Sequence, residues 1–204
     1  MNRLFVWNLA SLLFLANVVP AAAQGRPAGA STAPRFEIGA FGGGAWTDSR
    51  ETIISALGGL STVQADVDDS GMWGITADFN TPRGSQAEIF YQRQDSKLKV
   101  KSGGSVILET DAAVEYIQAG GLGGYRQGNV RPYGSLTLGA THFTFDNPDV
   151  EDEWDFSMIF GFGAKVYLQN EKLGVRMDGR FPWTFTDGQD FWQFTLAGGV
   201  FAIF

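Results

Sequence analysis

The sequence predicts an all-β fold, an eight-stranded antiparallel up-and-down transmembrane β-barrel, on three observations. Residues 35–204 divide into segments in which apolar side chains alternate with polar or small ones, as in strands that face lipid on one side and a lumen on the other. The composition is 44% hydrophobic and 14% aromatic, yet no apolar run beyond residue 23 has the roughly 20 residues of a spanning helix. The segment 191–204 is aromatic and apolar, and pairing with the first strand of a closed barrel would protect such a strand from aggregation.

The first 23 residues have the organisation of a cleaved secretory signal peptide. Arg3 supplies a positive charge, residues 4–19 are mostly apolar, and alanines precede the expected cleavage site. A membrane anchor is the alternative, but the apolar run is short for a spanning helix and is interrupted by Asn8 and Asn17. We therefore expect a protein that is exported.

The rest of the chain has the length of one domain. Residues 24–34 are small, polar and proline-containing, so we expect a flexible periplasmic lead-in there. We expect residues 35–204 to form the outer-membrane barrel. The formal net charge of −7 argues against a nucleic-acid partner. Because the chain has no cysteine, neither a lipoprotein attachment nor a disulfide framework is expected.

Eight segments of alternating side chains are the expected strands. They lie at about residues 35–46, 71–79, 85–96, 111–126, 130–144, 154–168, 173–183 and 190–204. The connections are short at 80–84, 127–129 and 169–172 and longer at 47–70, 97–110, 145–153 and 184–189. Short periplasmic turns that alternate with long external loops are typical of outer-membrane barrels. We therefore expect both ends of the barrel domain on the periplasmic side.

The first three segments alternate cleanly. The side chains expected to face lipid are Phe36, Ile38, Ala40, Trp73, Ile75, Ala77, Phe79, Ala87, Ile89 and Tyr91. Those expected to face the lumen are Glu37, Gly39, Phe41, Met72, Gly74, Thr76, Asp78, Glu88, Phe90, Gln92 and Gln94. The carboxylates fix this assignment, because a charge on the lipid face is costly.

The fourth segment, 111–126, is the least regular. Because Glu115 is charged, we expect it in the lumen. The side chains that then face lipid are Val114, Tyr116 and Leu122. The same alternation also turns Gln118 outward, so a bulge or a different register stays open for this segment.

The last four segments alternate clearly. The side chains expected to face lipid are Leu136, Leu138, Ala140, Phe156, Met158, Phe160, Phe162, Ala164, Val166, Leu168, Val175, Met177, Phe181, Trp183, Trp192, Phe194, Leu196, Val200 and Phe204. Those expected to face the lumen include Tyr133, Ser135, Thr137, Thr141, Ser157, Gly161, Gly163, Lys165, Arg176, Asp178, Arg180 and Gln193. Charges at every second position of 173–183 indicate a lumen most strongly.

The expected signal peptide, the eight segments, the stretch 130–141 (VRPYGSLTLGAT) and the terminal Phe204 resemble the small outer-membrane β-barrel superfamily of OmpA-, OmpX- and OmpW-like proteins. The resemblance concerns architecture over the whole chain after the signal peptide. It implies a bacterial outer-membrane location, contact with outer-membrane lipid and lipopolysaccharide, and recognition of the last strand by the barrel-assembly machinery. That assembly signal would consist of Leu196, Val200, Ala202 and Phe204. OmpA continues into a peptidoglycan-binding domain whereas this chain stops, so cell-wall tethering is not expected.

The expected lumen collects charges of both signs. Its charge network consists of Glu37, Glu88, Glu115, Lys165, Arg176, Asp178 and Arg180, with Asp78 beside them. Since an eight-stranded barrel is narrow enough to be filled by its own side chains, these charges can pair and seal the lumen. The alternative is a narrow pore for small solutes, in which Arg176 and Arg180 exchange carboxylate partners to open a water path.

The long connections are rich in acidic residues. These are Asp48, Glu51, Asp66, Asp68, Asp69, Asp146, Asp149, Glu151, Asp152, Glu153 and Asp155. A solvated surface explains them; the alternative is a low-affinity divalent-cation site that bridges the carboxylates to lipopolysaccharide phosphates. Residues 53–57 add an apolar patch that could contact lipid or a partner. No metal-ligand spacing appears, so no resident metal or cofactor is expected.

Catalysis is not expected. His142 is the single histidine and lies near Thr144 and Asp146, but the His-x-Ser pair of lipid-modifying barrels is missing. The glycines of 120–124 lie in an expected strand and not before a helix, so they indicate close strand packing rather than a nucleotide-binding loop.

A soluble lipocalin-like barrel is a further alternative, since it would also follow a signal peptide. The outward side of 154–168 is too apolar for water and argues against it. We therefore predict a monomeric, non-enzymatic outer-membrane barrel with a structural or surface-interaction role.

Overall fold

The computed structural model describes residues 36–47, 50–56, 59–81, 84–102, 105–146, 152–168, 172–186 and 190–204. The expected signal peptide, residues 1–23, and the expected lead-in, residues 24–34, lie outside this part of the chain. No helix among the described residues is long and apolar enough to cross a membrane.

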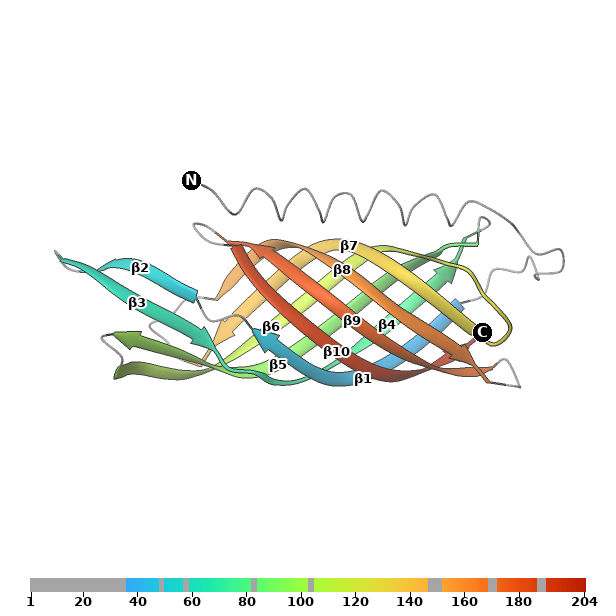
Figure 1. The fold of residues 1–204 in the computed structure, drawn as a ribbon, viewed down its shortest axis with the longest axis horizontal. Helices are drawn as coiled ribbons and strands as arrows, with labels where there is room; N and C mark the ends of the chain where they lie inside the picture. The colour runs from blue at the N-terminus through green and yellow to red at the C-terminus, as the bar shows by residue number, and fades with distance from the viewer. Residues whose placement is uncertain are drawn as a thin grey trace.

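The described residues form ten β-strands (Figure 1). They are β1 (Phe36–Thr47), β2 (Arg50–Ala56), β3 (Gly59–Val67), β4 (Ser70–Asn80), β5 (Gln86–Ser102), β6 (Ser105–Gly124), β7 (Val130–Phe145), β8 (Glu153–Tyr167), β9 (Leu173–Phe185) and β10 (Asp190–Ile203). All but β2 and β3 correspond to the eight predicted segments.

The eight corresponding strands close into a barrel. Their order around it is β5-β4-β1-β10-β9-β8-β7-β6, and β6 pairs again with β5. The first and last strands, β1 and β10, pair from Glu37–Ile203 to Thr47–Gln193. Every neighbouring pair is antiparallel, so the predicted all-β, eight-stranded up-and-down barrel is confirmed.

Two of the connections predicted as loops contain strands. Within 47–70, β2 and β3 form a hairpin, and β3 pairs with the outer part of β5 from Val63–Ser102 to Val67–Leu98. Within 97–110, β5 and β6 continue to pair as far as Ser102 and Ser105. The loop prediction was wrong because it read each segment by itself, whereas these strands are defined by pairing with one another: β2 with β3, β5 with β6, and β3 with the more distant β5.

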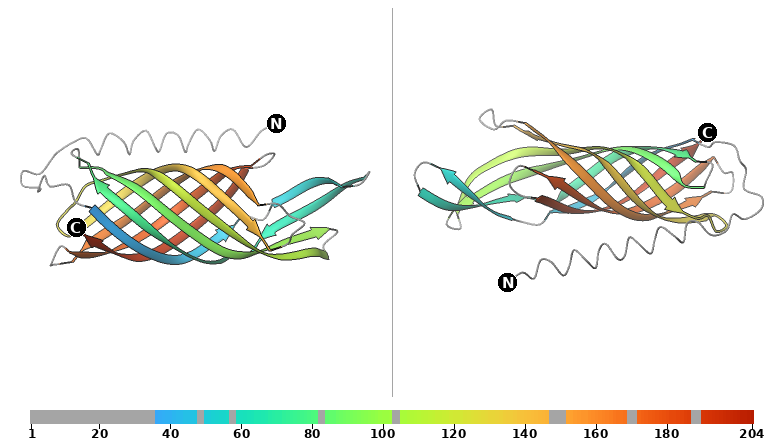
Figure 2. Two further views of the ribbon diagram at one scale, coloured as in Figure 1. Left: turned by 180° about the vertical axis from the view of Figure 1, so that it is seen from behind. Right: turned by 90° about the horizontal axis from the view of Figure 1, so that it is seen from above.

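The additional pairing lengthens the sheet at one end of the barrel (Figures 1 and 2). There β2, β3 and the outer parts of β5 and β6 extend beyond the barrel, while the C-terminal end of the chain lies at the other end. We call the two ends the long-loop end and the short-turn end. The projecting strand residues, 50–56, 59–67, 97–102 and 105–111, are called the outer ribbon.

At the short-turn end, the turn between β4 and β5 shows why a glycine is needed there. The Thr81 amide donates to the Ser85 carbonyl at 2.9 Å, and Gly84 closes the turn with a φ of 84°, which a residue with a side chain rarely adopts. Arg131 of β7 reaches across and donates from Nη2 to the Gly84 carbonyl at 2.7 Å.

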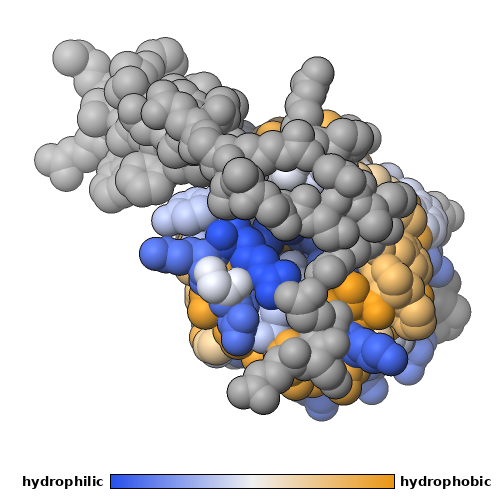
Figure 3. Space-filling model, turned by 90° about the vertical axis from the view of Figure 1, so that its right-hand side faces the viewer, coloured by the Kyte–Doolittle hydropathy of each residue, from blue (hydrophilic) through white to orange (hydrophobic). Residues whose placement is uncertain are grey.

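The two faces of the barrel wall differ in chemistry. Inward side chains are buried, and most of the buried polar ones belong to this face. Exposed large hydrophobic side chains on the outer face include Ile38, Trp73, Ile75, Phe79, Ile89, Leu136, Leu138, Phe156, Phe162, Val175, Met177, Phe181, Leu196 and Val200. Figure 3 shows this hydrophobic flank beside the more hydrophilic short-turn end. Burial follows the predicted faces in every barrel strand except β6.

In β6 the predicted faces are reversed. The lumenal side chains are Val114, Tyr116, Gln118 and Leu122, each at most 1% exposed. Ile117 on the opposite face is 49% exposed, and Glu115 shares that outer face. The prediction was wrong because it placed Glu115 in the lumen on its charge alone, whereas neighbouring strands supply its partners on the outside. With Glu115 on the outer face, the regular alternation of β6 places Gln118 in the lumen, so no bulge is needed to explain its position.

The glycine cluster in β6 is explained in part by close strand packing. A Cβ at Gly120 would collide with the backbone of Leu136, and one at Gly124 with that of Pro132. Gly121 and Gly123 have no such restriction. The expected close approach therefore applies to Gly120 and Gly124, the first and last glycines of the cluster.

Candidate functional site

The charged side chains of the lumen gather in its short-turn half. Glu37 lies near the start of β1, Lys165 near the end of β8 and Arg176 near the start of β9. In an antiparallel barrel these strand ends meet at one level. We call the group the charge plug; its members are Glu37, Asp78, Glu88, Lys165, Arg176, Asp178 and Arg180.

Lys165 of β8 contacts three other strands, β1, β4 and β5, in the part of the plug nearest the short-turn end. Its Nζ lies 2.7 Å from Glu37 Oε2 and 2.7 Å from Asp78 Oδ2, and it donates to Gln86 Oε1 at 3.0 Å. The second oxygen of Glu37 accepts from Tyr167 Oη at 3.0 Å and Gln86 Nε2 at 2.9 Å. The ammonium thus has three acceptors, as its three N–H groups require.

Arg176 holds the centre of the plug. It donates from Nε and Nη2 to the two oxygens of Asp178 at 2.7 and 2.9 Å, from Nη2 to Glu88 at 2.9 Å and from Nη1 to Thr76 at 3.0 Å. Tyr133 donates its hydroxyl to the same Asp178. A guanidinium presents five donors in a fixed plane, and this one uses them to connect β4, β5 and β9.

Arg180 lies at the edge of the plug that faces the long-loop end. Its Nη2 donates to Glu88 at 3.2 Å, and it lies 3.7 Å from Asp178. Its guanidinium carbon lies 4.0 Å from the centroid of the Phe90 ring and 5.5 Å from that of Phe41, within the range of cation–π attraction. Arg180 therefore links the charged layer to an aromatic layer above it.

The charge plug is closed to water. All seven members are between 0 and 3% exposed. Buried charges persist only when they are paired and hydrogen-bonded, and each of these has an oppositely charged partner. These side chains are almost entirely inaccessible to water, so they block the lumen at this level.

Between the plug and the long-loop end, the lumen is filled by apolar and uncharged polar side chains. Its apolar cluster is Phe41, Ala45, Met72, Phe90, Val114, Tyr116, Ile159 and Ala197. Gln193 donates to Thr47 at 3.0 Å and accepts from Tyr116 at 3.3 Å. Among the described residues, both amide atoms of Gln92 are buried without a hydrogen-bond partner, which is unusual for a buried polar side chain.

Sequence analysis placed six of the seven predicted network residues where the structure brings them together. Glu115 is the exception. The residues it missed are the neutral partners and one cation: Thr76 and Tyr133 were assigned to the lumen without a role, and Gln86, Arg131 and Tyr167 were not singled out. Arg131 is two residues from Tyr133 on β7, and Tyr167 is two residues from Lys165 on β8. The alternation of side chains therefore predicts that both face the lumen.

Glu115 lies on the outer face in a cluster of its own. Its Oε1 accepts from Tyr91 Oη at 2.5 Å and from Arg93 Nη1 at 3.0 Å, and its Oε2 lies 3.1 Å from His142 Nδ1. His142 therefore pairs with Glu115 rather than with the acid at position 146 considered from the sequence.

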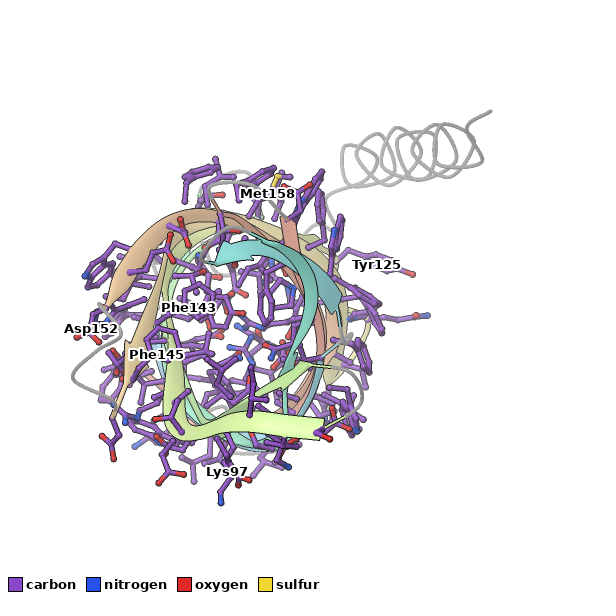
Figure 4. All side chains as sticks on the ribbon, turned by 90° about the vertical axis from the view of Figure 1, so that its left-hand side faces the viewer. Lys97, Tyr125, Phe143, Phe145, Asp152 and Met158 are labelled. Carbon is purple, nitrogen blue, oxygen red and sulfur yellow. The ribbon has the colours of Figure 1, made fainter. Side chains whose placement is uncertain are left out.

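A hollow of about 490 Å³ lies at the long-loop end. Its charged lining is Asp68, Asp69, Arg93, Asp95, Lys97, Asp111 and Asp146. Figure 4 views this end, with Phe143 inside the wall and Lys97 outside. Within the described ranges no three acidic or histidine side chains are grouped to hold a metal ion.

Parts of the acidic loops predicted to bind cations lie outside the described side chains. These are Asp48, Glu51, Asp66, Asp149 and Glu151, together with the apolar patch 53–57. The backbone of that patch up to residue 56 belongs to β2. The divalent-cation site stays a prediction.

The residues of the predicted assembly signal lie along the outer face of β10. Leu196, Val200 and Phe204 are 44%, 62% and 71% exposed, and Ala202 is partly buried. β10 pairs with β1 and β9, so only its side chains remain available on the outer face. Their recognition by assembly machinery stays a prediction.

Comparison with known proteins finds similarity in structure. No protein-family model matches the sequence, and no curated protein has a significantly similar sequence. The crystal structure of Neisserial surface protein A is 13% identical with a TM-score of 0.58, over 82% of this chain and 96% of that chain. A solid-state NMR structure of the outer membrane protein AlkL is 16% identical with a TM-score of 0.53, over 89% and 96%.

A third structure is that of Ail, the attachment invasion locus protein of Yersinia pestis, in complex with the heparin analogue sucrose octasulfate. It is 14% identical with a TM-score of 0.50, over 83% of this chain and 99% of that chain. At such low identity the likeness concerns the fold. Together with the closed sheet, it shows that this chain has the fold of the small eight-stranded outer-membrane β-barrels.

Proposed function

We propose that this protein is a non-enzymatic barrel of the bacterial outer membrane with a sealed lumen and a structural or surface-interaction role at its long-loop end. The observation that carries the proposal is the charge plug, whose members are paired and at most 3% exposed. A conducting pore needs a water-accessible path lined by polar groups. The plug instead joins strands across the lumen and fills it.

The outer face supports a membrane location. Every barrel strand contributes exposed large apolar side chains to it, which is unfavourable in water and expected in lipid. Trp46, Trp73 and Trp154, each at least 45% exposed, lie toward the long-loop end, as in the aromatic girdle of a membrane interface. The signal peptide expected from the sequence would supply the export.

The outer ribbon supports a surface-interaction role. It extends the sheet beyond the barrel, and Val106 and Ile107 on it are 50% and 61% exposed. The similar fold of Ail, named for attachment and invasion, is consistent with such a role. The heparin analogue bound to Ail is a polyanion, which the acidic hollow of this chain does not favour.

We also propose that the protein is a monomer assembled through β10. Closure between β1 and β10 leaves no free edge within the barrel for a second copy. The outward residues of β10 would contact the assembly machinery before closure, and lipid or lipopolysaccharide afterwards.

A narrow pore for small solutes is the second candidate. Its support is the unpartnered amide of Gln92 and the unpartnered Thr195 hydroxyl above the plug, since buried polar groups without partners are usually hydrated. Such a pore would require rearrangement of the charge plug.

Single-channel conductance of the refolded mature chain in a planar bilayer tests the two candidates. We expect silence from protein that is shown to be folded, and silence also from Arg180→Ala, because Lys165 and Arg176 still close the lumen below it. Arg93→Ala, which removes an outer-face arginine, is the matched control. Discrete openings of the natural chain that Arg180→Ala alters and Arg93→Ala does not would make the pore the primary function.

The absence of catalysis is tested separately. Lipid A from cells that produce the protein and from cells that produce His142→Ala should have the same mass spectrum. A modification present only with the natural chain would contradict the non-enzymatic role.

A further inference from the structure

A row of polar and aromatic side chains crosses four strands on the outer face. The register places Arg93 of β5 beside Glu115 of β6, Glu115 beside His142 of β7, and His142 beside Trp154 of β8. Because outward residues on neighbouring antiparallel strands lie side by side, the four form one continuous line. We call it the outer row.

The outer row is locked by its own contacts. Glu115 receives hydrogen bonds on both oxygens, from Tyr91 and Arg93 on one and from His142 on the other. The His142 ring stacks on the Trp154 indole, with centroids 4.1 Å apart and planes 13° apart. The side chains of Glu115 and His142 are only 18% and 15% exposed, whereas Trp154 is 58% exposed. His142 therefore covers one face of the Trp154 indole, while Trp154 as a whole stays accessible.

The position of the row is the boundary between the apolar wall and the acidic long-loop end. Toward the short-turn end, the next outward residues include Ile117 and Phe156, 49% and 55% exposed. Toward the long-loop end, the outward residues of β5 and β6 are Asp95 beside Ala113 and then Lys97 beside Asp111. Under the proposed membrane placement, on which this inference rests, lipid headgroups of the outer leaflet lie at this boundary.

The charges around the row select among headgroups. Arg93 is already bound by Asp95 at 2.9 Å and Glu115 at 3.0 Å. The hollow that Arg93 helps to line has five aspartates against two cations, Arg93 and Lys97. Carboxylates exceed cations, so a phosphate would be repelled. A neutral ring with many hydroxyl groups fits better, because hydroxyls can donate to carboxylates and accept from a guanidinium while the C–H face of the ring packs on an indole face.

We propose that the outer row is a binding site for the sugar headgroup of a glycolipid in the outer leaflet. The sugar ring stacks on the exposed face of Trp154. Hydroxyl groups on the side of the ring toward β6 bond to the carboxylate of Glu115. Those of a longer headgroup reach Arg93 and Asp95 on β5, three strand spacings or roughly 14 Å from β8. The acyl chains lie against the apolar wall that begins at Phe156. The ligand class is a neutral or amino sugar carried by lipid.

The single histidine of the chain provides a direct probe. Protein labelled with ¹⁵N-histidine in phosphatidylcholine nanodiscs is titrated with octyl glucoside, and the imidazole resonances of His142 are followed. Octyl phosphocholine tests the headgroup with the same chain, and methyl glucoside tests the sugar without a chain. We expect a saturable shift with octyl glucoside, and at least about tenfold weaker binding of the other two.

Variants test which residues form the site. Trp154→Ala should weaken octyl glucoside binding roughly tenfold, and Glu115→Gln, which keeps the side-chain shape, should weaken it as well. Trp46→Ala, which removes a Trp with 45% exposure on β1, should leave it unchanged.

Each outcome bears on one claim. Equal responses to octyl glucoside and octyl phosphocholine, or no saturable shift, would overturn the sugar site. Equal affinity for methyl glucoside would overturn the lipid origin of the ligand. Protein that fails to insert into the nanodisc, as judged by protease protection of the barrel, would contradict the proposed membrane function instead. Inserted protein without a response contradicts this inference alone.

Discussion

The two ends of the barrel contain the same kinds of charged side chain in opposite surroundings. In the charge plug, Lys165 and its partners are at most 1% exposed. In the outer ribbon, Lys97 and Glu109 also pair, at 3.1 Å, but their side chains are 53% and 45% exposed. Similar distances therefore accompany very different burial.

This difference teaches that distance alone does not rank ion pairs. Removal of one partner from a buried pair leaves an uncompensated charge without water and is strongly destabilising. Removal of one partner from an exposed pair leaves a charge that water solvates, and the effect is small. Four substitutions, from the largest expected effect to the smallest, test this ranking.

The largest effect is expected for Lys165→Met. The substitution leaves Glu37 buried without a cation and Asp78 with only Arg176, 3.4 Å away, which should lower the free energy of unfolding by about 3–5 kcal/mol. Urea-induced unfolding in lipid vesicles measures it. Lys97→Met is the matched control, and equal effects of the two substitutions would refute the ranking.

Glu88→Gln should have the second-largest effect. It removes the charge that lies between Arg176 and Arg180 and keeps the size of the side chain, so we expect a loss of about 2–3 kcal/mol. The same unfolding measurement applies. Stability equal to that of the natural chain would mean that the remaining carboxylates, Asp178 and Asp78, satisfy both guanidinium groups.

Glu115→Gln tests an intermediate environment. Glu115 is 18% exposed while its partner Arg93 is 37% exposed, so we expect a loss of only about 1 kcal/mol. A loss as large as that of Lys165→Met would show that the lipid-facing side of the wall behaves like the lumen. Tyr91→Phe, which removes one hydrogen bond to the same carboxylate, should cost less.

The smallest effect concerns Lys97 in the outer ribbon. The hydrogen bond to Glu109 raises the pKa of Lys97 above its ordinary value of 10.5. A raised lysine pKa stabilises the fold below pH 10.5 and ceases to do so as the pH rises through the folded value. Glu109→Gln should lower the pKa of Lys97, measured by NMR titration of Nζ, without a measurable change in stability at pH 7. An unchanged pKa would mean that the pair does not persist in solution.

Much of the barrel could be predicted from the sequence because alternation is a local property. In β9, Arg176, Asp178 and Arg180 at every second position determine which face is buried, and no knowledge of the partner strands is needed. In β6 the same reasoning failed, since Glu115 has its partners on β5 and β7. A charge indicates the lumen only where no neighbouring strand neutralises it outside.

The membership of the plug was predictable and its geometry was not. The alternation of side chains predicted that Glu37, Lys165 and Arg176 all face the lumen. It could not predict that Lys165 lies 2.7 Å from two carboxylates, because that depends on the tilt and pairing of all eight strands. The hydroxyl of Tyr133 completes the plug, although nothing in its sequence neighbourhood distinguishes it from other alternating tyrosines.

The pairing of β5 with β6 beyond the barrel determines how far the protein reaches. Residues 97–102 of β5 continue past the level at which β7 ends opposite Ala112, and at about 3.3 Å per residue they add roughly 20 Å. The headgroup layer on one side of a bilayer is only about 5–8 Å thick. Under the proposed placement in the outer membrane, the outer ends of β5 and β6 therefore stand clear of the lipid, where an antibody or a neighbouring cell can reach them.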